Sequence, residues 1–291
     1  MKLCLNCKNE FNNEEWLCPA CNYKTFIQNG EIFLSQKPLQ REISFDNEYF
    51  KELFQVESGS FWFCSRNKLI LWALGKYFPY AKSFLEVGCG TGFVLSAIEN
   101  KFPDINLYGT EYFSDALDFA QSRLKRAKLF QANALQLPFK NEFDIIGAFD
   151  VIEHVEQDET AIRAMYEAVK PGGGIILTVP QHKALWSKHD EYAHHRRRYS
   201  AKELINKVKL VGFNIITTTS FMTLLLPLLL TFRKNFKGDD IKRDIMSQYK
   251  INRFTNAILE KILDFERILI EYSVKFPLGS SLMLIGRKNF K

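Results

Sequence analysis

From residue 83 to residue 220, short apolar runs alternate with segments of helical periodicity. The apolar runs are typical of strands, and the periodic segments are typical of helices. The predicted strands cover 83–88, 105–112, 127–132, 143–150, 173–180 and 213–220, and the predicted helices cover 91–101, 114–126, 158–170 and 201–211. Strands that alternate with helices form a mostly parallel sheet with helices on both faces. We therefore expect an α/β fold that binds its ligands at the carboxyl ends of the strands.

Further elements are predicted on both sides of this region. Residues 44–79 show helical periodicity with many aromatic positions, and residues 240–275 predict a long amphipathic helix. The stretch "SSLMLIGRK" predicts a closing strand, and Ser200-x-x-Glu203 is a capping box that opens the helix at 201–211. The apolar and helical part at about 221–275 is interpreted as an insertion in the α/β domain.

The run "FMTLLLPLLL" at 221–230 is almost wholly apolar but too short to span a bilayer. Three interpretations stay open. The run could be a core or dimer helix. It could line a cavity for a lipid-like substrate, or residues 221–234 could touch a membrane surface peripherally.

Composition and charge narrow the class of protein. The chain has 291 residues, of which 46% are hydrophobic and 25% charged, so a buried core is expected. The net charge of +6 favours anionic partners, without the concentrated basic stripe of a dedicated nucleic-acid binder. The N-terminal "MKLCLNCKNE" lacks the apolar region of a secretory signal, so we expect a cytoplasmic protein, with peripheral contact at the inner membrane face as an option.

Four cysteines form a metal-binding pattern near the N-terminus. Cys4-x-x-Cys7 and Cys18-x-x-Cys21 are two knuckles separated by ten residues. Four thiolates at this spacing predict one Zn²⁺ site, which supplies folding energy that so short a segment cannot obtain from burial. We expect a zinc ribbon with a trailing strand at 1–35 and an α/β domain at 36–291. The ribbon either contacts substrate or is purely structural.

The glycine loop follows the first predicted strand of the α/β domain. It reads Gly88-Cys89-Gly90-Thr91-Gly92, which differs from the G-x-G-x-x-G spacing of dinucleotide-binding loops. Glu111 ends the next strand, where an acid that accepts hydrogen bonds from ribose hydroxyls belongs. The ligand should therefore carry a nucleoside without a pyrophosphate on the helix N-terminus. This spacing disfavours a nicotinamide oxidoreductase.

At this point the sequence resembles the class I S-adenosylmethionine-dependent methyltransferases. The matching stretches are "FLEVGCGTG", "GTEY", "QANALQLPF", "FDIIGAFDVIEHV" and "VKPGGGIILTVP", which cover about residues 83–180 in the order of that family. The resemblance implies a seven-stranded, mostly parallel Rossmann-like sheet whose last strand is antiparallel. It also implies S-adenosylmethionine as methyl donor.

The resemblance further implies which residues surround the cofactor. Glu86, Gly88 and Gly90 belong at the methionine tail, Glu111 at the ribose, and Asn133 with Ala134 at the adenine. The full set of implied cofactor-binding residues is Glu86, Gly88, Cys89, Gly90, Gly92, Glu111, Tyr112, Asn133, Ala134 and Asp150. Family members commonly have Asp where this chain has Asn133, and the Asn carbonyl can still accept from the adenine amino group.

Methyl transfer to a hydroxyl or amine needs an aligned acceptor and a group that takes its proton. All five histidines lie between 154 and 195, and the stretch 180–200 is dense in His, Arg and acids. Here "VP-x-H", "LWS-x-x-D" and "H-x-R-R-Y" resemble a bacterial methyltransferase subgroup of largely unassigned substrate. The candidate catalytic residues are His154, His182 and His195 as bases, Asp190 as an orienter, and Arg197 with Arg198 for an anionic group. The alternatives are a solvated loop of mutually paired charges and, for His154, a core histidine.

The function predicted from these features is methyl transfer from S-adenosylmethionine to an anionic small-molecule or glycolipid-like, lipid-linked acceptor. One alternative is a ribosomal-RNA base methyltransferase, because some of those enzymes carry an N-terminal zinc ribbon. RNA is disfavoured by the modest charge. The other alternative is a non-catalytic S-adenosylmethionine-binding module.

Overall fold

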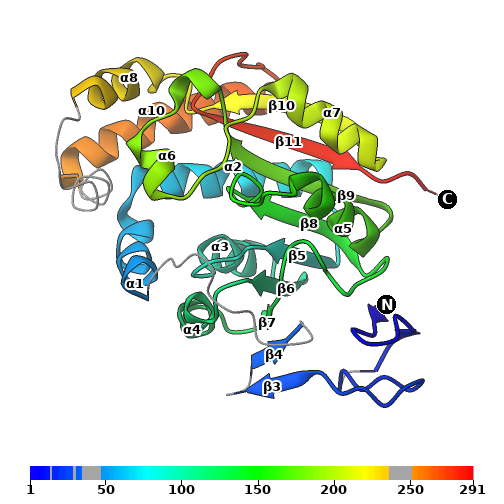
Figure 1. Cartoon of the computed structure of the whole chain (residues 1–291). Helices are drawn as coiled ribbons and strands as arrows, with labels where there is room; N and C mark the ends of the chain where they lie inside the picture. Colours follow the sequence, from blue (N-terminus) through cyan, green and yellow to red (C-terminus); the bar gives the residue numbers. More distant parts are fainter. Residues whose placement is uncertain (14, 29–30, 35–46, 236–250, 291) are drawn as a thin grey trace.

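A nine-stranded sheet forms the centre of the protein (Figure 1). The computed structural model describes residues 1–290 except 14, 29–30, 35–46 and 236–250. Its strand order is β10-β11-β9-β8-β5-β6-β7-β4-β3. The strands of this sheet are β3 (Phe26–Gln28), β4 (Glu31–Phe33), β5 (Ser83–Val87), β6 (Asn106–Glu111), β7 (Lys128–Gln131), β8 (Phe143–Phe149), β9 (Val169–Pro180), β10 (Asn214–Phe221) and β11 (Ser281–Arg287). The α/β class and the mostly parallel sheet expected from the sequence are confirmed.

Seven of the nine strands form the sheet that the sequence predicted. Strands β4 to β9 in this sheet are joined by parallel pairings, whereas β11 runs antiparallel to both β9 and β10. The other two strands were not predicted as part of the sheet. Strand β4 pairs in parallel with β7, and β3 pairs antiparallel with β4. This N-terminal hairpin covers the edge of β7, whose backbone groups would otherwise lack partners.

Helices cover both faces of the sheet (Figure 1). The helices are α1 (Asn47–Val56), α2 (Phe61–Tyr77), α3 (Phe93–Lys101), α4 (Ser114–Arg123), α5 (Asp158–Ala168), α6 (Lys188–Tyr192), α7 (Ala201–Val211), α8 (Leu226–Asn235) and α10 (Arg253–Glu271), with short 3₁₀ turns η1 (Glu57–Gly59) and η2 (Lys183–Leu185). The predicted helix at 240–275 is described only from residue 251. Among the described residues, every helix is too short or too polar to cross a membrane.

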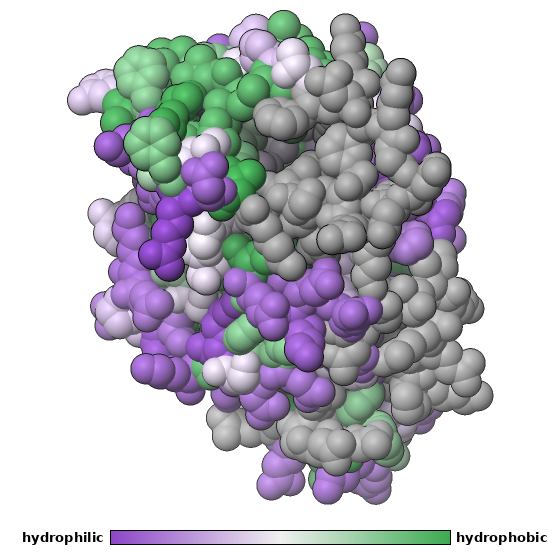
Figure 2. Space-filling model, turned by 90° about the vertical axis from the view of Figure 1, so that its left-hand side faces the viewer, coloured by the Kyte–Doolittle hydropathy of each residue, from purple (hydrophilic) through white to green (hydrophobic). Residues whose placement is uncertain are grey.

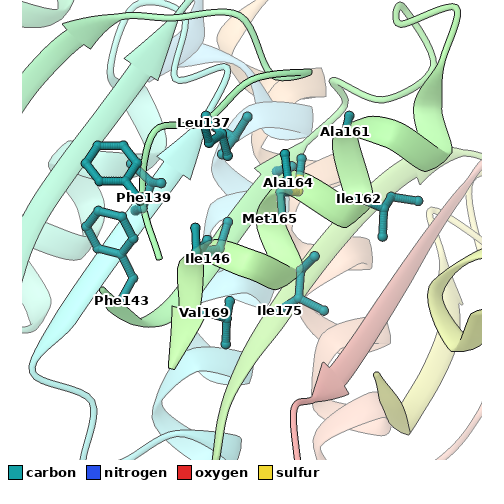
Figure 3. Close-up of a cluster of buried hydrophobic side chains, with 14 of the residues drawn as sticks. Leu137, Phe139, Phe143, Ile146, Ala161, Ile162, Ala164, Met165, Val169 and Ile175 are labelled. Atoms are coloured by element: carbon teal, nitrogen blue, oxygen red, sulfur yellow. The ribbon is translucent and has the colours of Figure 1, made fainter. Parts of the chain in front are cut away.

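Successive side chains of a central strand pack alternately into two hydrophobic cores, one on each face of the sheet. Ile146 of β8 packs with Met165 of α5 in one cluster, while its neighbour Ile145 packs with Ile70 of α2 and Leu95 of α3 in the other. This alternation is the two-residue period of a strand. Figure 3 shows the first cluster, in which the side chains of α5 meet those of β8 and β9. The two packed faces hold the carboxyl ends of β5, β6 and β8 in fixed relation.

The N-terminal segment packs directly on the α/β domain. Its two short strands, β1 (Lys2–Leu3) and β2 (Glu10–Phe11), pair antiparallel. The buried Trp16 ring meets Phe130 and Phe139 edge-on, with ring centroids 5.8 and 5.7 Å away. Leu3 also donates its backbone N–H to the Pro138 carbonyl at 2.8 Å. The segment therefore shares a core with the sheet, and the predicted boundary near residue 35 falls in the undescribed range 35–46.

Candidate active site

One large cavity, of about 890 Å³, lies at the carboxyl ends of the central strands. Its walls come from the loops after β5, β6, β7 and β8, from α1 and α2, and from residues 186–198. This is where a doubly wound sheet binds its ligands. No residue before Tyr49 lines the cavity within the part of the chain that the structure describes.

The glycine loop brings backbone to the cavity wall. Gly88 and Cys89 donate their N–H groups to the Thr110 carbonyl of β6 at 2.7 and 2.9 Å, which fixes the loop against its neighbour strand. Gly90 has φ 51°, and a Cβ built on it meets no protein atom within 4 Å. Position 90 therefore opens into the cavity, and a ligand can approach its backbone. Gly92 faces Ala120 and Leu124 instead, so its absence of a side chain serves helix packing.

Two buried carboxylates flank this loop. Glu111 Oε2 accepts the Gly90 N–H at 2.8 Å, and its Oε1 accepts the Tyr112 N–H at 2.7 Å. Glu86 is 2% exposed, and its Oε2 accepts no hydrogen bond from the described residues. Burial raises the pKa of both carboxyl groups, most strongly that of Glu86. Glu86 thus has an oxygen without a hydrogen bond from the described part of the chain, and the Gly90 backbone beside it is open to the cavity. A carboxyl group in this position suits a cationic ligand, such as the ammonium and sulfonium groups of S-adenosylmethionine.

Asn133 and Ala134, which the resemblance places at the adenine, line the cavity after β7. The Asn133 Oδ1 atom already accepts the backbone N–H of Leu135 at 2.9 Å. A carbonyl oxygen has a second lone pair, so the residue can still receive one further donor. Cys89 is buried, and burial raises the pKa of its thiol well above the ordinary value, so it packs as an uncharged side chain.

Asp150 directly follows β8 and has a left-handed backbone conformation with φ 57°. Its carboxylate forms an ion pair with Arg66 of α2, whose guanidinium lies 4.7 Å from the centre of the Trp62 ring. Arg66 was not among the predicted site residues. The sequence signal around it was only an aromatic helix, because a partner 84 positions away carries no local pattern.

Glu57 was also absent from the predicted site residues, because its partners too are distant in sequence. It is 4% exposed, accepts the Thr91 hydroxyl at 2.7 Å and pairs with Arg123 at 2.7 Å. Thr91 belongs to the glycine loop and Arg123 to α4, so Glu57 connects the turn after α1 to the glycine loop. Burial raises the pKa of Glu57, while the positive charge of Arg123 opposes that shift.

The acceptor side of the cavity contains a network centred on Asp190. His195 Nδ1 lies 2.8 Å from Asp190 Oδ1, and Arg198 Nε donates to the same oxygen at 2.7 Å. Asp190 also closes a capping box with Ser187 at the start of α6. Burial acts in the opposite direction, but the hydrogen bond from His195 and the charge of Arg198 hold the pKa of Asp190 well below its usual range. The fold thus brings the predicted Asp190, His195 and Arg198 together.

His154 packs beside this network. Its ring lies 4.7 Å from the His195 ring in an edge-to-face arrangement. Burial, followed by the charge of His195, lowers the pKa of His154 to about 3, so its imidazole is neutral near pH 7. Both histidines line the cavity.

His182 and Arg197 do not line the cavity. Arg197 Nη1 contacts Asp158 Oδ2 at 3.0 Å, whereas Arg198 contacts Asp190. Because their partners are different carboxylates, these two guanidiniums do not converge on one anion. Trp186, His189 and Arg196 line the cavity instead, although none of them was among the candidate site residues predicted from the sequence.

The four N-terminal cysteines form a second centre, away from the cavity. Cys4 Sγ lies 3.6 Å from Cys21 Sγ, and Cys7 Sγ lies 3.6 Å from Cys18 Sγ. None of the four is in a disulfide. Four sulfurs about 2.3 Å from a tetrahedral ion would stand about 3.8 Å apart, so this cluster is compatible with structural Zn²⁺.

Known proteins resemble this chain in both sequence and fold. A family profile described as "Methyltransferase domain" matches residues 85–175. A malonyl-[acyl-carrier protein] O-methyltransferase of Priestia megaterium is 22% identical over 124 residues, which cover 42% of this chain and 45% of that protein. A phosphoethanolamine N-methyltransferase 2 of Caenorhabditis elegans is 29% identical over 119 residues, which cover 39% of this chain and 27% of that protein. The chain thus spans less than half the length of these curated relatives.

Solved structures extend the likeness over most of the chain. The phosphoethanolamine N-methyltransferase 2 of Haemonchus contortus, in complex with S-adenosyl-L-methionine, superposes with a TM-score of 0.57 at 16% identity. That match covers 86% of this chain and 59% of the other. A possible histamine N-methyltransferase of Thermotoga maritima gives a TM-score of 0.53 at 18% identity and covers 84% of this chain and 96% of the other. Residues 85–175 thus match a methyltransferase domain, and the two solved structures show that the fold of such enzymes extends over most of the chain.

Proposed function

We propose that the protein transfers a methyl group from S-adenosylmethionine to an acceptor that enters the cavity between α2 and residues 186–198. The observation that carries this proposal is the continuity of one cavity from the glycine loop to the His154 and His195 rings. Cofactor and acceptor would therefore share a single cavity. Such an arrangement supplies the alignment on which methyl transfer mainly depends.

The chemistry needs little covalent help from the protein. S-adenosylmethionine supplies an activated methyl group, whose bond to sulfur breaks as the acceptor atom bonds to the methyl carbon. Glu86 and the open backbone at Gly90 would hold the cofactor's tail, and Glu111 would meet its ribose. The acceptor's proton would leave at the wall formed by Glu153, His154 and His195, which faces the same cavity.

Aromatic side chains support an acceptor with an apolar body. The cavity is lined by Tyr49, Trp62, Phe113, Trp186 and Tyr192, and Leu229 of α8 also reaches it. Figure 2 shows hydrophobic side chains gathered near the top of the face it presents, where Figure 1 shows α8 and α10. Leu228 and Leu230 of α8 are each 40% exposed. A lipid-linked acceptor could lie across this surface with its reacting end in the cavity.

Arg196 is the residue that supports an anionic acceptor. Three arginines among the described residues line the cavity, and two of them, Arg66 and Arg198, are engaged by the carboxylates Asp150 and Asp190. The Arg196 side chain is 41% exposed and pairs with Glu156, which is 70% exposed. A surface pair of this kind is weak and can give way to a phosphate or carboxylate.

The test is methyl transfer from labelled S-adenosylmethionine into three cell fractions: lipid extract, small polar molecules and RNA. We expect label in the lipid or small-molecule fraction, and its loss in Gly90→Val. Label in RNA would replace the proposed acceptor class with a base methyltransferase. Binding of the cofactor without label in any fraction would favour a non-catalytic module.

Arg196→Ala tests the anionic part separately. With an identified anionic acceptor, KM should rise while cofactor affinity stays constant. Arg163→Ala is the matched control, because Arg163 is exposed on α5 and does not line the cavity. An equal KM in Arg196→Ala and wild type would show that Arg196 does not bind an anionic group of the acceptor.

A further inference from the structure

Glu153 is a buried acid at the cavity wall, and within the described part of the chain its carboxylate receives no hydrogen bond. It is 0% exposed, and neither of its carboxylate oxygens accepts a hydrogen bond from another described residue. Asp190 is equally buried but accepts from Ser187, His195 and Arg198. An acid without donors in such a place is costly unless a ligand satisfies it.

Two imidazoles stand beside this acid. One ligand atom from each of Glu153, His154 and His195 can be chosen so that all three lie within 4.8 Å of one another. His195 Nε2 is 3.9 Å from Glu153 Oε1. Ligands about 2.1 Å from a tetrahedral ion stand about 3.4 Å apart, so the His195 and Glu153 atoms need to approach by only about half an ångström.

Asp190 holds the His195 imidazole in an orientation that suits a metal ligand. It engages His195 Nδ1 at 2.8 Å, and this favours the tautomer that carries its proton on Nδ1. The Nε2 lone pair then faces Glu153. A carboxylate that holds the far nitrogen of a ligating histidine is a recurrent arrangement in metal sites. Ser187 and Arg198 in turn fix Asp190, so the orientation is built into the fold.

We propose that Glu153, His154 and His195 bind one divalent transition-metal ion at the wall of the acceptor cavity. Two imidazoles and one carboxylate suit ions such as Mn²⁺, Fe²⁺, Co²⁺ or Zn²⁺. Three protein ligands leave at least one coordination position open, and all three residues line the cavity. This centre is separate from the four-cysteine cluster, whose thiolates favour Zn²⁺.

The role of the ion rests on the proposed methyl transfer. An acceptor hydroxyl at the open position would become more acidic and release its proton to water. The resulting oxygen would then form the bond to the methyl carbon as the carbon–sulfur bond breaks. In this arrangement His195 acts through the ion and does not itself take the proton.

The experiment uses the full chain with its cysteine cluster filled with Zn²⁺. Mn²⁺ is titrated in, and the electron paramagnetic resonance signal of the free ion is measured. We expect one Mn²⁺ bound per chain, with affinity at least tenfold lower in Glu153→Gln and in His195→Asn. Asp190→Asn should lower the affinity by about 10–100-fold through the lost orientation of His195.

Glu159→Gln is the matched control, since this glutamate is 59% exposed on α5 and should leave Mn²⁺ affinity unchanged. Cofactor binding by each variant checks that its fold persists. If wild type binds neither Mn²⁺ nor Co²⁺, or if Glu153→Gln binds as tightly as wild type, the metal site is overturned. Methyl transfer without metal binding would keep the proposed function and overturn the site. Metal binding without methyl transfer to any acceptor would keep the site and overturn the function.

Discussion

Arg198 and Asp190 form an ion pair inside the protein, with Nε 2.7 Å from Oδ1 and side chains that are only 4% and 0% exposed. The same guanidinium donates to the Gln181 carbonyl at 3.1 Å. The pair therefore connects the end of β9 to α6, which forms part of the cavity wall. A buried pair of this kind leaves an uncompensated charge when one partner is removed.

Removal of Asp190 should consequently destabilise the whole domain. Asp190→Ala leaves Arg198 buried without its carboxylate, and we expect the free energy of unfolding to fall by about 3–5 kcal/mol. Urea denaturation followed by circular dichroism measures this change. Glu156→Gln removes the exposed partner of Arg196 and should cost at most about 1 kcal/mol. Similar losses in the two variants would mean that burial does not set the strength of the Asp190 pair.

Asp158 should make stability depend on pH in the acid range. Burial alone would raise its pKa, yet hydrogen bonds from Lys207 and Tyr199 hold that pKa below its ordinary value. A carboxylate with a lowered folded pKa contributes stability above its unfolded pKa of about 3.9 and loses it as pH falls through the folded pKa. The stability difference between wild type and Asp158→Asn should therefore shrink as pH falls below about 4.

Urea unfolding at pH 6, 5, 4 and 3 measures that difference. Asp104→Asn serves as control, because Asp104 is exposed and its replacement should change stability little at any of these values. A constant difference between wild type and Asp158→Asn over the series would show that the carboxylate charge of Asp158 does not stabilise the fold.

The position of Gly90 predicts separate effects on stability and on cofactor binding. In Gly90→Ala the new methyl meets no protein atom within 4 Å, so the loss of stability is limited to the left-handed backbone, about 1–2 kcal/mol. The methyl projects into the cavity, where the proposed cofactor would lie, and affinity for S-adenosylhomocysteine should then fall at least tenfold. Calorimetry gives the affinity, and thermal denaturation gives the stability. Gly59→Ala, at an exposed glycine with open space around it, should preserve the affinity.

The parts of the fold and site that could be predicted share one physical property, which is locality. Each strand or helix is predicted from the pattern of residues within that element. The glycine loop is likewise identified from the spacing of its own glycines. Asp190 and His195 were predicted together because they lie five residues apart in one dense stretch. Their hydrogen bond at 2.8 Å then follows from the turn that ends α6.

Other features depend on contacts between distant segments, which leave no local pattern. Glu57 contacts Thr91 and Arg123, which lie 34 and 66 positions away, and only the assembled fold brings them together. The pairing of β4 with β7 likewise joins the N-terminal segment to an edge that the sequence does not identify. Arg197 was placed with Arg198 because they are neighbours in sequence, but in the fold they pair with different carboxylates, those of Asp158 and Asp190.

Because the cysteine segment packs on the sheet, we expect bound Zn²⁺ to stabilise the whole domain and not only the cysteine segment. Trp16 is 2% exposed and lies among Phe11, Phe130 and Phe139, so the segment and the sheet share this contact. Cys18→Ser should lower the bound zinc and the melting temperature of the whole domain together. We expect a stability loss of about 3–5 kcal/mol, comparable to the loss of a large buried aromatic side chain. Metal analysis and near-ultraviolet circular dichroism, which reports on Trp16, follow both effects.

Cofactor affinity should fall in the same variant, because β4 braces β7 and the loop after β7 holds Asn133 at the cavity. Cys64→Ser is the matched control, since the Cys64 thiol lies outside the cluster and donates to the Ser58 carbonyl at 3.5 Å. That variant should keep its zinc, its melting temperature and its affinity for S-adenosylhomocysteine. If Cys18→Ser loses zinc but keeps both the melting temperature and the affinity, the cysteine segment is an independent unit and the shared packing around Trp16 adds little to the stability of the methyltransferase domain.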